Sequence, residues 1–119
     1  MKRNILILAI IMTMLVGFTG IAMAGTQDFT LVNNTGVDLY EIYISPSNTD
    51  EWEENVLHGH VLYNGNSFFI GFSGYSNAYW DIKIVDGNGN YVDWRDINLN
   101  NVYRVKLFWD GNQYRAQCN

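Results

Sequence analysis

Two histidines are the first residues in this sequence with the chemistry of metal ligands. His58 and His60 are two residues apart, so in an extended strand both imidazoles would point to the same side and could begin a metal site. A third ligand would have to come from Glu53 or Glu54 on the preceding turn. The competing interpretation is two polar residues where a loop joins a strand, because His-x-His without further ligands is common. A small metal-dependent hydrolase is the activity that this pair would permit.

A second group of metal-binding side-chain types follows in a glycine-rich segment. Asp86, Asn88, Asn90 and Asp93 place oxygen atoms at alternating positions among glycines, which is how calcium loops distribute their side-chain ligands. The match is incomplete, because Tyr91 stands where the helix-loop-helix calcium motif requires Gly. A hairpin turn explains the same residues without a metal, since Asp, Asn and Gly favour turn conformations. We expect no cofactor, with calcium at this turn as the alternative.

A third candidate site is the acidic run around Trp52. A bulky aromatic among carboxylates in a loop suits a docking site for a basic or sugar partner. Alternatively, Trp52 folds back over an open end of the core while the carboxylates remain solvated around it. Tyr75 and Tyr79, near the loop over residues 72–77, are further candidate binding aromatics. The four carboxylates are Asp50, Glu51, Glu53 and Glu54.

No catalytic set accompanies these residues. A nucleophile needs a base and an orienting acid beside it, and neither histidine neighbours a Gly-x-Ser-x-Gly elbow. Carboxylates are numerous, but they are expected in turns and at exposed strand positions, and a domain of this size offers little room for an enclosed cleft. We therefore expect a protein that is not an enzyme.

Short strands must position all of these residues. No stretch has a long apolar face at helical spacing, whereas β-branched and aromatic residues recur between clusters of Gly, Asn and Asp. Hairpins are expected across the turns at 33–36, 64–66, 86–90 and 110–111, and a short helical turn over 50–55. In the strand over 78–85, Trp80, Ile82 and Ile84 should face inward while Asp81 and Lys83 face water. The sequence predicts an all-β antiparallel β-sandwich of about seven to eight short strands. The expected strands cover 29–32, 37–45, 61–63, 67–72, 78–85, 91–94, 102–109 and 113–116.

The N-terminus has the three parts of a secretory signal. Lys2 and Arg3 precede an apolar stretch over 5–16, and Ala22-Met23-Ala24 supplies a small-x-small cleavage site. The alternative is an uncleaved anchor, because residues 5–24 are just long enough to cross a hydrocarbon core of about 30 Å. We expect a signal peptide over 1–24 and a single domain over 25–119. After cleavage the protein would be periplasmic or extracellular, without membrane attachment.

The charge and the cysteine content of the chain limit the classes of partner and the disulfides that are expected. The chain has 7 Lys and Arg against 12 Asp and Glu, and loss of Lys2 and Arg3 with the signal leaves a formal charge of −7. Binding to nucleic acid or to an anionic membrane surface is disfavoured, because both need a basic footprint. Cys118 is the single cysteine, so no intramolecular disulfide can form. A frayed tail residue and an intermolecular disulfide are the two interpretations of this thiol.

Several short motifs run through nearly all of the mature chain. They are Phe29-Thr-Leu-Val-Asn33, Thr35-Gly36, Tyr43-Ile-Ser-Pro-Ser47, Asp50-Glu-Trp52, Val56-Leu57 and Trp80-Asp-Ile82. In this combination the chain resembles a family of small exported bacterial β-sandwich proteins to which no function is assigned. Members are sometimes labelled argininosuccinate lyase, but that enzyme is large and helical, and nothing in this short β-rich sequence supports the label. The resemblance implies no binding or catalytic residue.

Three functional hypotheses remain at the level of sequence. The first is an exported binding or interaction module, whose surplus Tyr and Trp bind a protein or a glycan. The second is a structural or self-assembling envelope protein, whose exposed strand edges pair with other copies. The third is a small domain that binds calcium or a transition metal.

Overall fold

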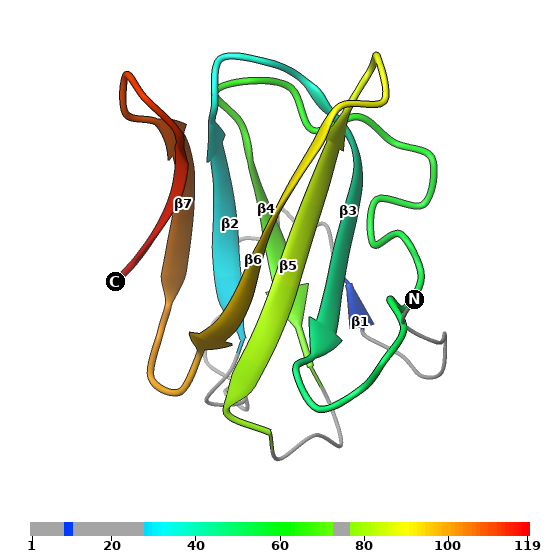
Figure 1. Cartoon of the computed structure of the whole chain (residues 1–119), viewed down its shortest axis with the longest axis vertical. Helices are drawn as coiled ribbons and strands as arrows, with labels where there is room; N and C mark the ends of the chain where they lie inside the picture. The colour runs from blue at the N-terminus through cyan, green and yellow to red at the C-terminus, as the bar shows by residue number, and fades with distance from the viewer. Residues whose placement is uncertain (1–8, 11–27, 73–76) are drawn as a thin grey trace, which may run out of the picture.

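The computed structural model describes residues 9–10, 28–72 and 77–119, which form two β-sheets packed face to face (Figure 1). One sheet has the strand order β1-β4-β2-β7-β8 and the other has the order β3-β5-β6. The predicted all-β sandwich is therefore confirmed, with seven strands from β2 to β8 and the two-residue β1. The strands are β1 (Ala9–Ile10), β2 (Phe29–Asn34), β3 (Leu39–Pro46), β4 (Ser67–Gly71), β5 (Tyr79–Asp86), β6 (Tyr91–Asn98), β7 (Arg104–Trp109) and β8 (Tyr114–Cys118).

The core lies between the sheets, and β5 contributes its largest side chain. Trp80, Ile82 and Ile84 are buried as predicted, because alternate residues of a strand point to the same face. The Trp80 ring stacks on Phe72 with the ring centroids 4.3 Å apart. Its indole Nε1 donates a hydrogen bond to the carbonyl of Asn77 at 3.1 Å. A buried Trp needs such an acceptor for its one donor, so this position suits Trp in particular.

The predicted hairpin between residues 29–32 and 37–45 is wrong, because β2 and β3 belong to different sheets. β2 pairs antiparallel with β4 and parallel with β7. The fully buried Asn33 explains the divergence: its Nδ2 donates to the carbonyls of Val37 and Leu62, each at 2.9 Å. Its Oδ1 accepts from the backbone and the hydroxyl of Thr35. These bonds shape a turn that carries the chain from one sheet to the other.

The predicted hairpin across 64–66 is also wrong, since residues 61–63 form only an isolated bridge between Leu62 and Leu39. The Asn64-Gly65 turn instead lies against the turn at 33–36. The Gly65 amide donates to the Asn33 carbonyl at 2.6 Å, and Asn64 Oδ1 accepts from the Gly36 amide. Gly65 has a φ of +96°, a conformation that other residues rarely adopt.

The two remaining hairpins are confirmed. β5 pairs antiparallel with β6, and β7 pairs antiparallel with β8. In each turn an aspartate accepts backbone amides close by in the chain: Asp86 from Asn88, and Asp110 from Asn112 and Gln113. Such Asx turns depend on neighbouring residues alone, which is why the sequence pattern predicts them.

The connection over residues 47–66 covers the sandwich beside β3 and contributes the buried Val56 and Leu57 to the core (Figure 1). The helical turn predicted over 50–55 is wrong, because the secondary structure there is irregular. Asn55 Oδ1 accepts the Ile42 amide, and the Val56 amide donates to the Ile42 carbonyl at 2.8 Å. Hydrogen bonds to the edge of β3 thus hold the segment against that strand.

The predicted signal segment lies outside the described residues, apart from β1. In β1, Ala9 pairs with Gly71 and Ile10 with Ile70 of β4. Across the described residues, no helix has the length and apolar character needed to span a membrane.

Candidate functional site

The outer surface of the β3-β5-β6 sheet brings together aromatic and charged side chains. The register places Tyr43 of β3 opposite Lys83 of β5, and Lys83 opposite Asp93 of β6. Trp52, from the connection, lies beside Tyr43 with ring centroids 6.3 Å apart. Tyr91 and Arg95 belong to the same surface through their contacts with Lys83 and Trp52. We call this surface the aromatic face; it consists of Tyr43, Trp52, Lys83, Tyr91 and Arg95.

Both cations of the aromatic face lie over rings. Lys83 Nζ is 4.8 Å from the ring centroid of Tyr91, 5.4 Å from that of Tyr43 and 5.9 Å from that of Trp52. The guanidinium carbon of Arg95 is 5.2 Å from the Trp52 ring centroid. At such distances a ring face attracts a cation. The contacts order three rings from three different segments around Lys83.

Carboxylates hold the polar atoms of this surface in place. The Tyr43 hydroxyl donates to Glu41 Oε1 at 2.6 Å. Burial, and then this hydrogen bond, raise the pKa of Tyr43 to about 12, so the phenol stays neutral at ordinary pH. Arg95 donates to Asp93 Oδ2 at 3.1 Å and lies 3.5 Å from Asp81 Oδ2.

Asp81 was expected to face water, but the residue is only 2% exposed. Its Oδ1 accepts the Ser47 hydroxyl at 2.7 Å and the Asp96 amide at 2.9 Å. Asp96 has a φ of +57°, in a stretch where the β5–β6 pairing shifts register. The expectation was wrong because the start of the connection and the irregular part of β6 both fold over this carboxylate. Asp81 therefore ties two segments of the outer surface together.

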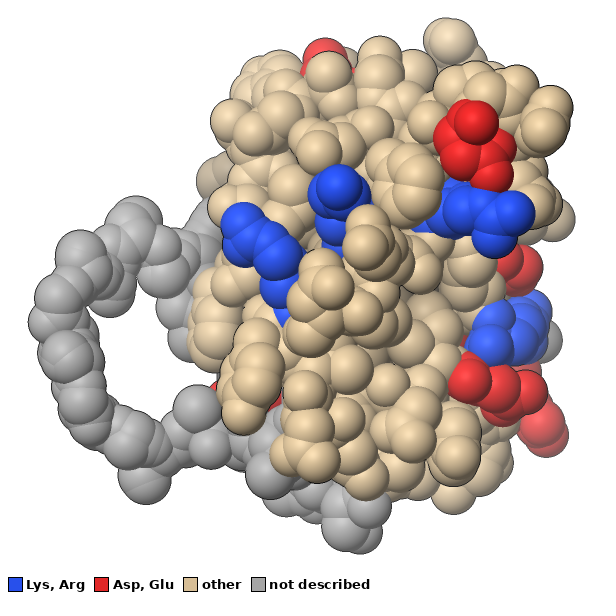
Figure 2. All heavy atoms as spheres, turned by 90° about the vertical axis from the view of Figure 1, so that its left-hand side faces the viewer, with Lys and Arg blue, Asp and Glu red and all other residues tan. Residues whose placement is uncertain are grey.

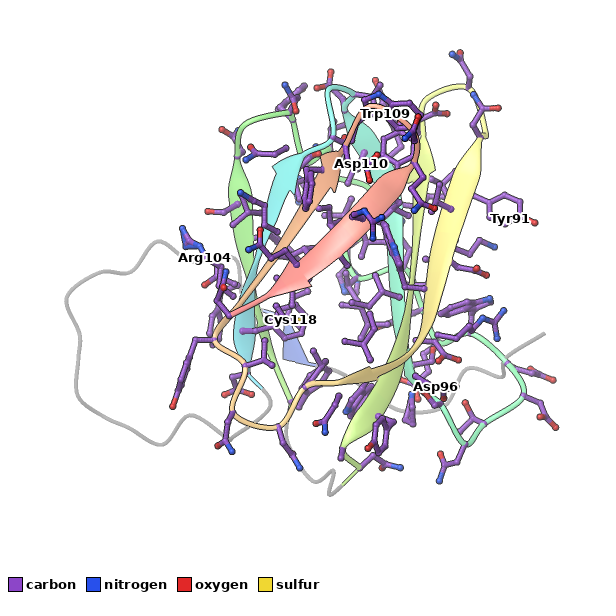
Figure 3. The ribbon with its side chains drawn as sticks, turned by 60° about the vertical axis from the view of Figure 1, so that its left-hand side comes forward. Tyr91, Asp96, Arg104, Trp109, Asp110 and Cys118 are labelled. Atoms are coloured by element: carbon purple, nitrogen blue, oxygen red, sulfur yellow. The ribbon has the colours of Figure 1, made fainter. Side chains whose placement is uncertain are left out.

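A groove of about 460 Å³ opens beside these two segments. Tyr79, at its wall, is 51% exposed, and the Tyr79 carbonyl accepts the Ser47 amide at 3.0 Å. Figure 3 shows Asp96 and Tyr91 on the same side of the molecule, toward opposite ends of β6. We call this feature the Tyr79 groove. Its described lining consists of Ser47, Asn48, Asn77, Ala78, Tyr79 and Asp96.

The four carboxylates of the acidic run around Trp52 differ in their exposure. Asp50 and Glu54 are exposed and Glu51 is half-buried. Glu53 is buried, at 4% exposure, and its amide donates to Ser45 Oγ at 2.8 Å. The expectation of four solvated carboxylates is thus wrong for Glu53, which is drawn inward by the bonds to β3. Trp52 is half-buried and contacts the outer surface of the sheet.

The two histidines do not share a strand. His58 lies in the turn over 56–59 with a φ of +50°, and both His58 and His60 are exposed. The geometry assumed for a His-x-His pair is therefore wrong. His58 Nε2 lies 3.7 Å from Glu54 Oε2, a contact between exposed groups that contributes little to stability.

The predicted calcium ligands are divided among the end of β5, the turn that follows it and β6. Desolvation alone would raise the pKa of Asp86, but hydrogen bonds from the Asn88 backbone and from the side chain and backbone of Asn90 lower it. Asp93 lies on β6 and pairs with Arg95 instead. Within 28–72 and 77–119, no three or more His, Cys, Asp or Glu side chains form a group that could hold a metal. Calcium binding stays a prediction, and the hairpin accounts for the contacts of Asp86.

Cys118 is part of strand β8, opposite Val105 of β7. The pairing continues to the last residue, because Asn119 accepts amides from Tyr103 and Arg104. The interpretation of Cys118 as a frayed tail is therefore wrong. Local burial of the sulfur raises the pKa of the thiol, although the residue as a whole is exposed. An intermolecular disulfide stays a prediction.

Sequence reasoning missed the part of the site that depends on the fold. Tyr79 was a candidate, whereas Asn48, Asn77 and Asp96 come from three separate segments and share no motif. The one available signal was Asn and Asp at segment ends, which is also typical of ordinary turns. Tyr75 lies outside the described residues.

The outer surface of the other sheet was also missed. Alternation in β7 and β8 turns Arg104, Lys106 and Arg115 outward, because the intervening Val105 and Leu107 are buried. In the side view of Figure 2, Lys and Arg side chains spread across the molecule, while most visible Asp and Glu lie toward one edge. We call this surface the basic face. It consists of Arg104, Lys106 and Arg115 together with the outward Val32, Phe69 and Phe108.

Comparison of the chain with protein-family models, with curated proteins and with solved structures finds no match in any of the three. The resemblance of its motifs to a family of small exported proteins therefore stays a prediction.

Proposed function

We propose that this protein is an exported, non-enzymatic binding module that holds its ligand on the aromatic face. The observation that carries the proposal is the convergence of Tyr43, Trp52 and Tyr91 around Lys83, outside the hydrophobic core. Aromatic rings that combine a broad apolar surface with a polar handle are the usual anchors of binding surfaces.

The arrangement suits binding because its rings are ordered and still accessible. Tyr91 is 62% exposed, while the cation contacts and the Tyr43–Glu41 hydrogen bond limit the conformations of the side chains. A surface ordered before binding loses less conformational entropy when the ligand arrives. A glycan or a protein segment could use such a platform.

The polar groups of the aromatic face favour holding a ligand over transferring protons. Glu41, Asp81 and Asp93 each accept a hydrogen bond from a neighbouring side chain. Tyr43 has its pKa raised to about 12, which is far from that of a general base at neutral pH. These groups thus serve as acceptors and as positioning contacts.

A direct test compares two tryptophans. The wild-type protein, Trp52→Ala and Trp109→Ala are applied to a glycan array and to a panel of immobilised basic and neutral peptides. Trp109 is the matched control, because it is 49% exposed on β7 and lies outside the aromatic face. We expect binding by the wild type and by Trp109→Ala, and about a tenfold weaker affinity for Trp52→Ala. Absence of any wild-type binding, or equal losses in the two variants, would refute the proposal.

A second candidate function is self-assembly through strand edges. β6 and β8 are the outer strands of their sheets, and a cleft of about 260 Å³ lies between their ends, with Val37, Leu39, Ile84, Val92 and Tyr114 in its lining. Unpaired edges beside apolar surface can add a strand from another chain. Sedimentation velocity at rising concentration tests this candidate, and a monomer throughout would argue against it.

A further inference from the structure

We propose that the Tyr79 groove is a subsite for a neutral oligosaccharide, with one sugar ring stacked on Tyr79 and its hydroxyls bonded to Asp96, Asn48 and Asn77. The inference rests on the proposed function, because the groove continues the aromatic face. It adds the class of ligand and the position of one of its rings.

Tyr79 provides the stacking surface. It points to the same side of β5 as Asp81 and Lys83, since side chains two apart in a strand share a face. Half of the residue is exposed, at 51%, and its ring borders the groove. An aromatic ring at the wall of a groove can cover the apolar side of a sugar, while the polar lining reaches the hydroxyls around its rim.

The polar groups in the mainly apolar lining favour a ligand without charge. Asn48 and Asn77 each offer both a donor and an acceptor, and Asp96 adds a carboxylate acceptor. Hydroxyl groups both donate and accept, so they match this mixture. An acidic sugar would face Asp96, and the described lining contains no Lys or Arg to balance its charge. Arg95, the neighbouring cation, already contacts Asp81 and Asp93.

The groove is held open by a buried carboxylate. Asp81 accepts the Ser47 hydroxyl and the Asp96 amide, and these two residues, which come from different segments, both line the groove. Asp96 keeps a left-handed φ of +57°, which Asp tolerates better than most residues. Lining segments that are already tied together need little reordering when a ligand binds.

The dimensions favour a chain of sugars. From Tyr79 to Val85, which pairs with Tyr91, the strand extends about 20 Å at about 3.3 Å per residue. Trp52 is connected to this outer surface of β5 through Arg95, which lies over the Trp52 ring and forms an ion pair with Asp81. A linear oligosaccharide lying along β5 would meet the Tyr79 groove at one end and the aromatic face at the other.

The test is calorimetric titration with sugar hexamers of three charge classes. The neutral hexamers are those of glucose and of N-acetylglucosamine, the acidic one is that of galacturonic acid, and the cationic one is that of glucosamine. The variants are Tyr79→Ala, Tyr79→Phe and Asp96→Asn, the last because Asn also tolerates the left-handed conformation. Tyr103→Ala is the matched control, since Tyr103 is an exposed tyrosine outside the groove lining.

We expect a neutral hexamer to bind, with about a tenfold loss of affinity in Tyr79→Ala and little loss in Tyr79→Phe. Asp96→Asn should weaken binding several-fold, and Tyr103→Ala should have no effect. Urea unfolding of each variant shows whether it is folded.

If wild-type binding depends on Trp52 but not on Tyr79 or Asp96, the proposed function stands and the subsite is overturned. A preference for the acidic or cationic hexamer overturns the ligand class. If no hexamer binds while a peptide binds through Trp52, the oligosaccharide subsite is refuted and the binding module is retained.

Discussion

The outer surfaces of the two sheets follow the same strand alternation, and yet their charges differ. On the aromatic face, Lys83 and Arg95 lie among the carboxylates of Glu41, Asp81 and Asp93. On the basic face, Arg104 and Lys106 alternate along β7 with buried residues, and no outward position of β2, β4, β7 or β8 carries a carboxylate.

The difference shows how little a net charge says about one surface. The mature chain is expected to carry −7, which disfavours polyanions in general, but the basic face is locally positive. The aromatic face is also covered in part by the connection, whose Trp52 and Ser47 contact β3 and β5 residues. A sheet surface that another segment covers can order its side chains, whereas an open surface leaves long side chains to the solvent.

The largest effect that distinguishes the two surfaces should come from Asp81. Asp81→Ala removes the acceptor of the Ser47 hydroxyl and of the Asp96 amide. We expect the free energy of unfolding to fall by about 3 kcal/mol, since bonds to a charged group are lost from a buried site. The measurement is urea unfolding. Lys106→Ala on the basic face is the control, with an expected loss of about 0.5 kcal/mol or less. Similar losses in both variants would contradict the comparison.

An intermediate effect is expected from the lysines themselves. Lys83 lies over three rings, whereas Lys106 lies over Phe108 at 5.4 Å. Replacement by Met keeps the apolar stem and removes the cation. We expect Lys83→Met to lose about 1 kcal/mol of stability and Lys106→Met to lose less than about half of that. Chemical unfolding measures both variants, and a larger loss for Lys106→Met would reverse the ranking.

Alkaline pH offers a smaller and more specific probe of the aromatic face. The pKa of Tyr43 rises from 10.0 to about 12 in the folded protein, first through burial and then through Glu41. The neutral phenol is thus favoured by folding, and its stabilisation is complete below pH 10 and is lost as the pH rises to about 12. In Tyr43→Phe, this loss should be absent from the pH profile of urea unfolding. Glu41→Gln should shift the loss to lower pH, and an unchanged profile in both variants would argue against the contact.

The smallest effect is expected at the turn beside the basic face. The hydrogen bond from Arg115, and then those from the amides of Gln113 and Asn112, lower the pKa of Asp110 from 3.8 to about 2. This stabilisation is complete above pH 3.8 and is lost as the pH falls to about 2. Because the group is exposed, solvent screens the pair and the change is small. Arg115→Gln should flatten the acid limb of the stability profile, and an unaltered limb would show that the pair contributes nothing.

Features that depend on interactions between residues close in the sequence could be predicted, and features that depend on distant residues could not. The inward face of β5 was predicted correctly, and so were the turns that follow Asp86 and Asp110. The alternation of β5 predicted that Asp81 faces water and that Ile82 is buried, and only the second prediction is correct. The alternation does place Asp81 on the outer surface, but it contains no information about Ser47 and Asp96, which cover it.

The sequence by itself determined the local elements. These are the strands of alternating residues, the turns in which an aspartate side chain accepts backbone amides, and a set of apolar residues sufficient for one core. These depend on residues that are neighbours in the chain. Only the tertiary structure decided that β2 pairs parallel with β7 and that Trp52 lies against Tyr43. It also decided that Asn48, Asn77 and Asp96 line one groove. The physical reason is that strand pairing, and the packing of loops over a sheet, depend on which residues are buried across the whole chain. A turn residue such as Asn33 is compatible with more than one path of the chain, and its buried hydrogen bonds determine which path is taken.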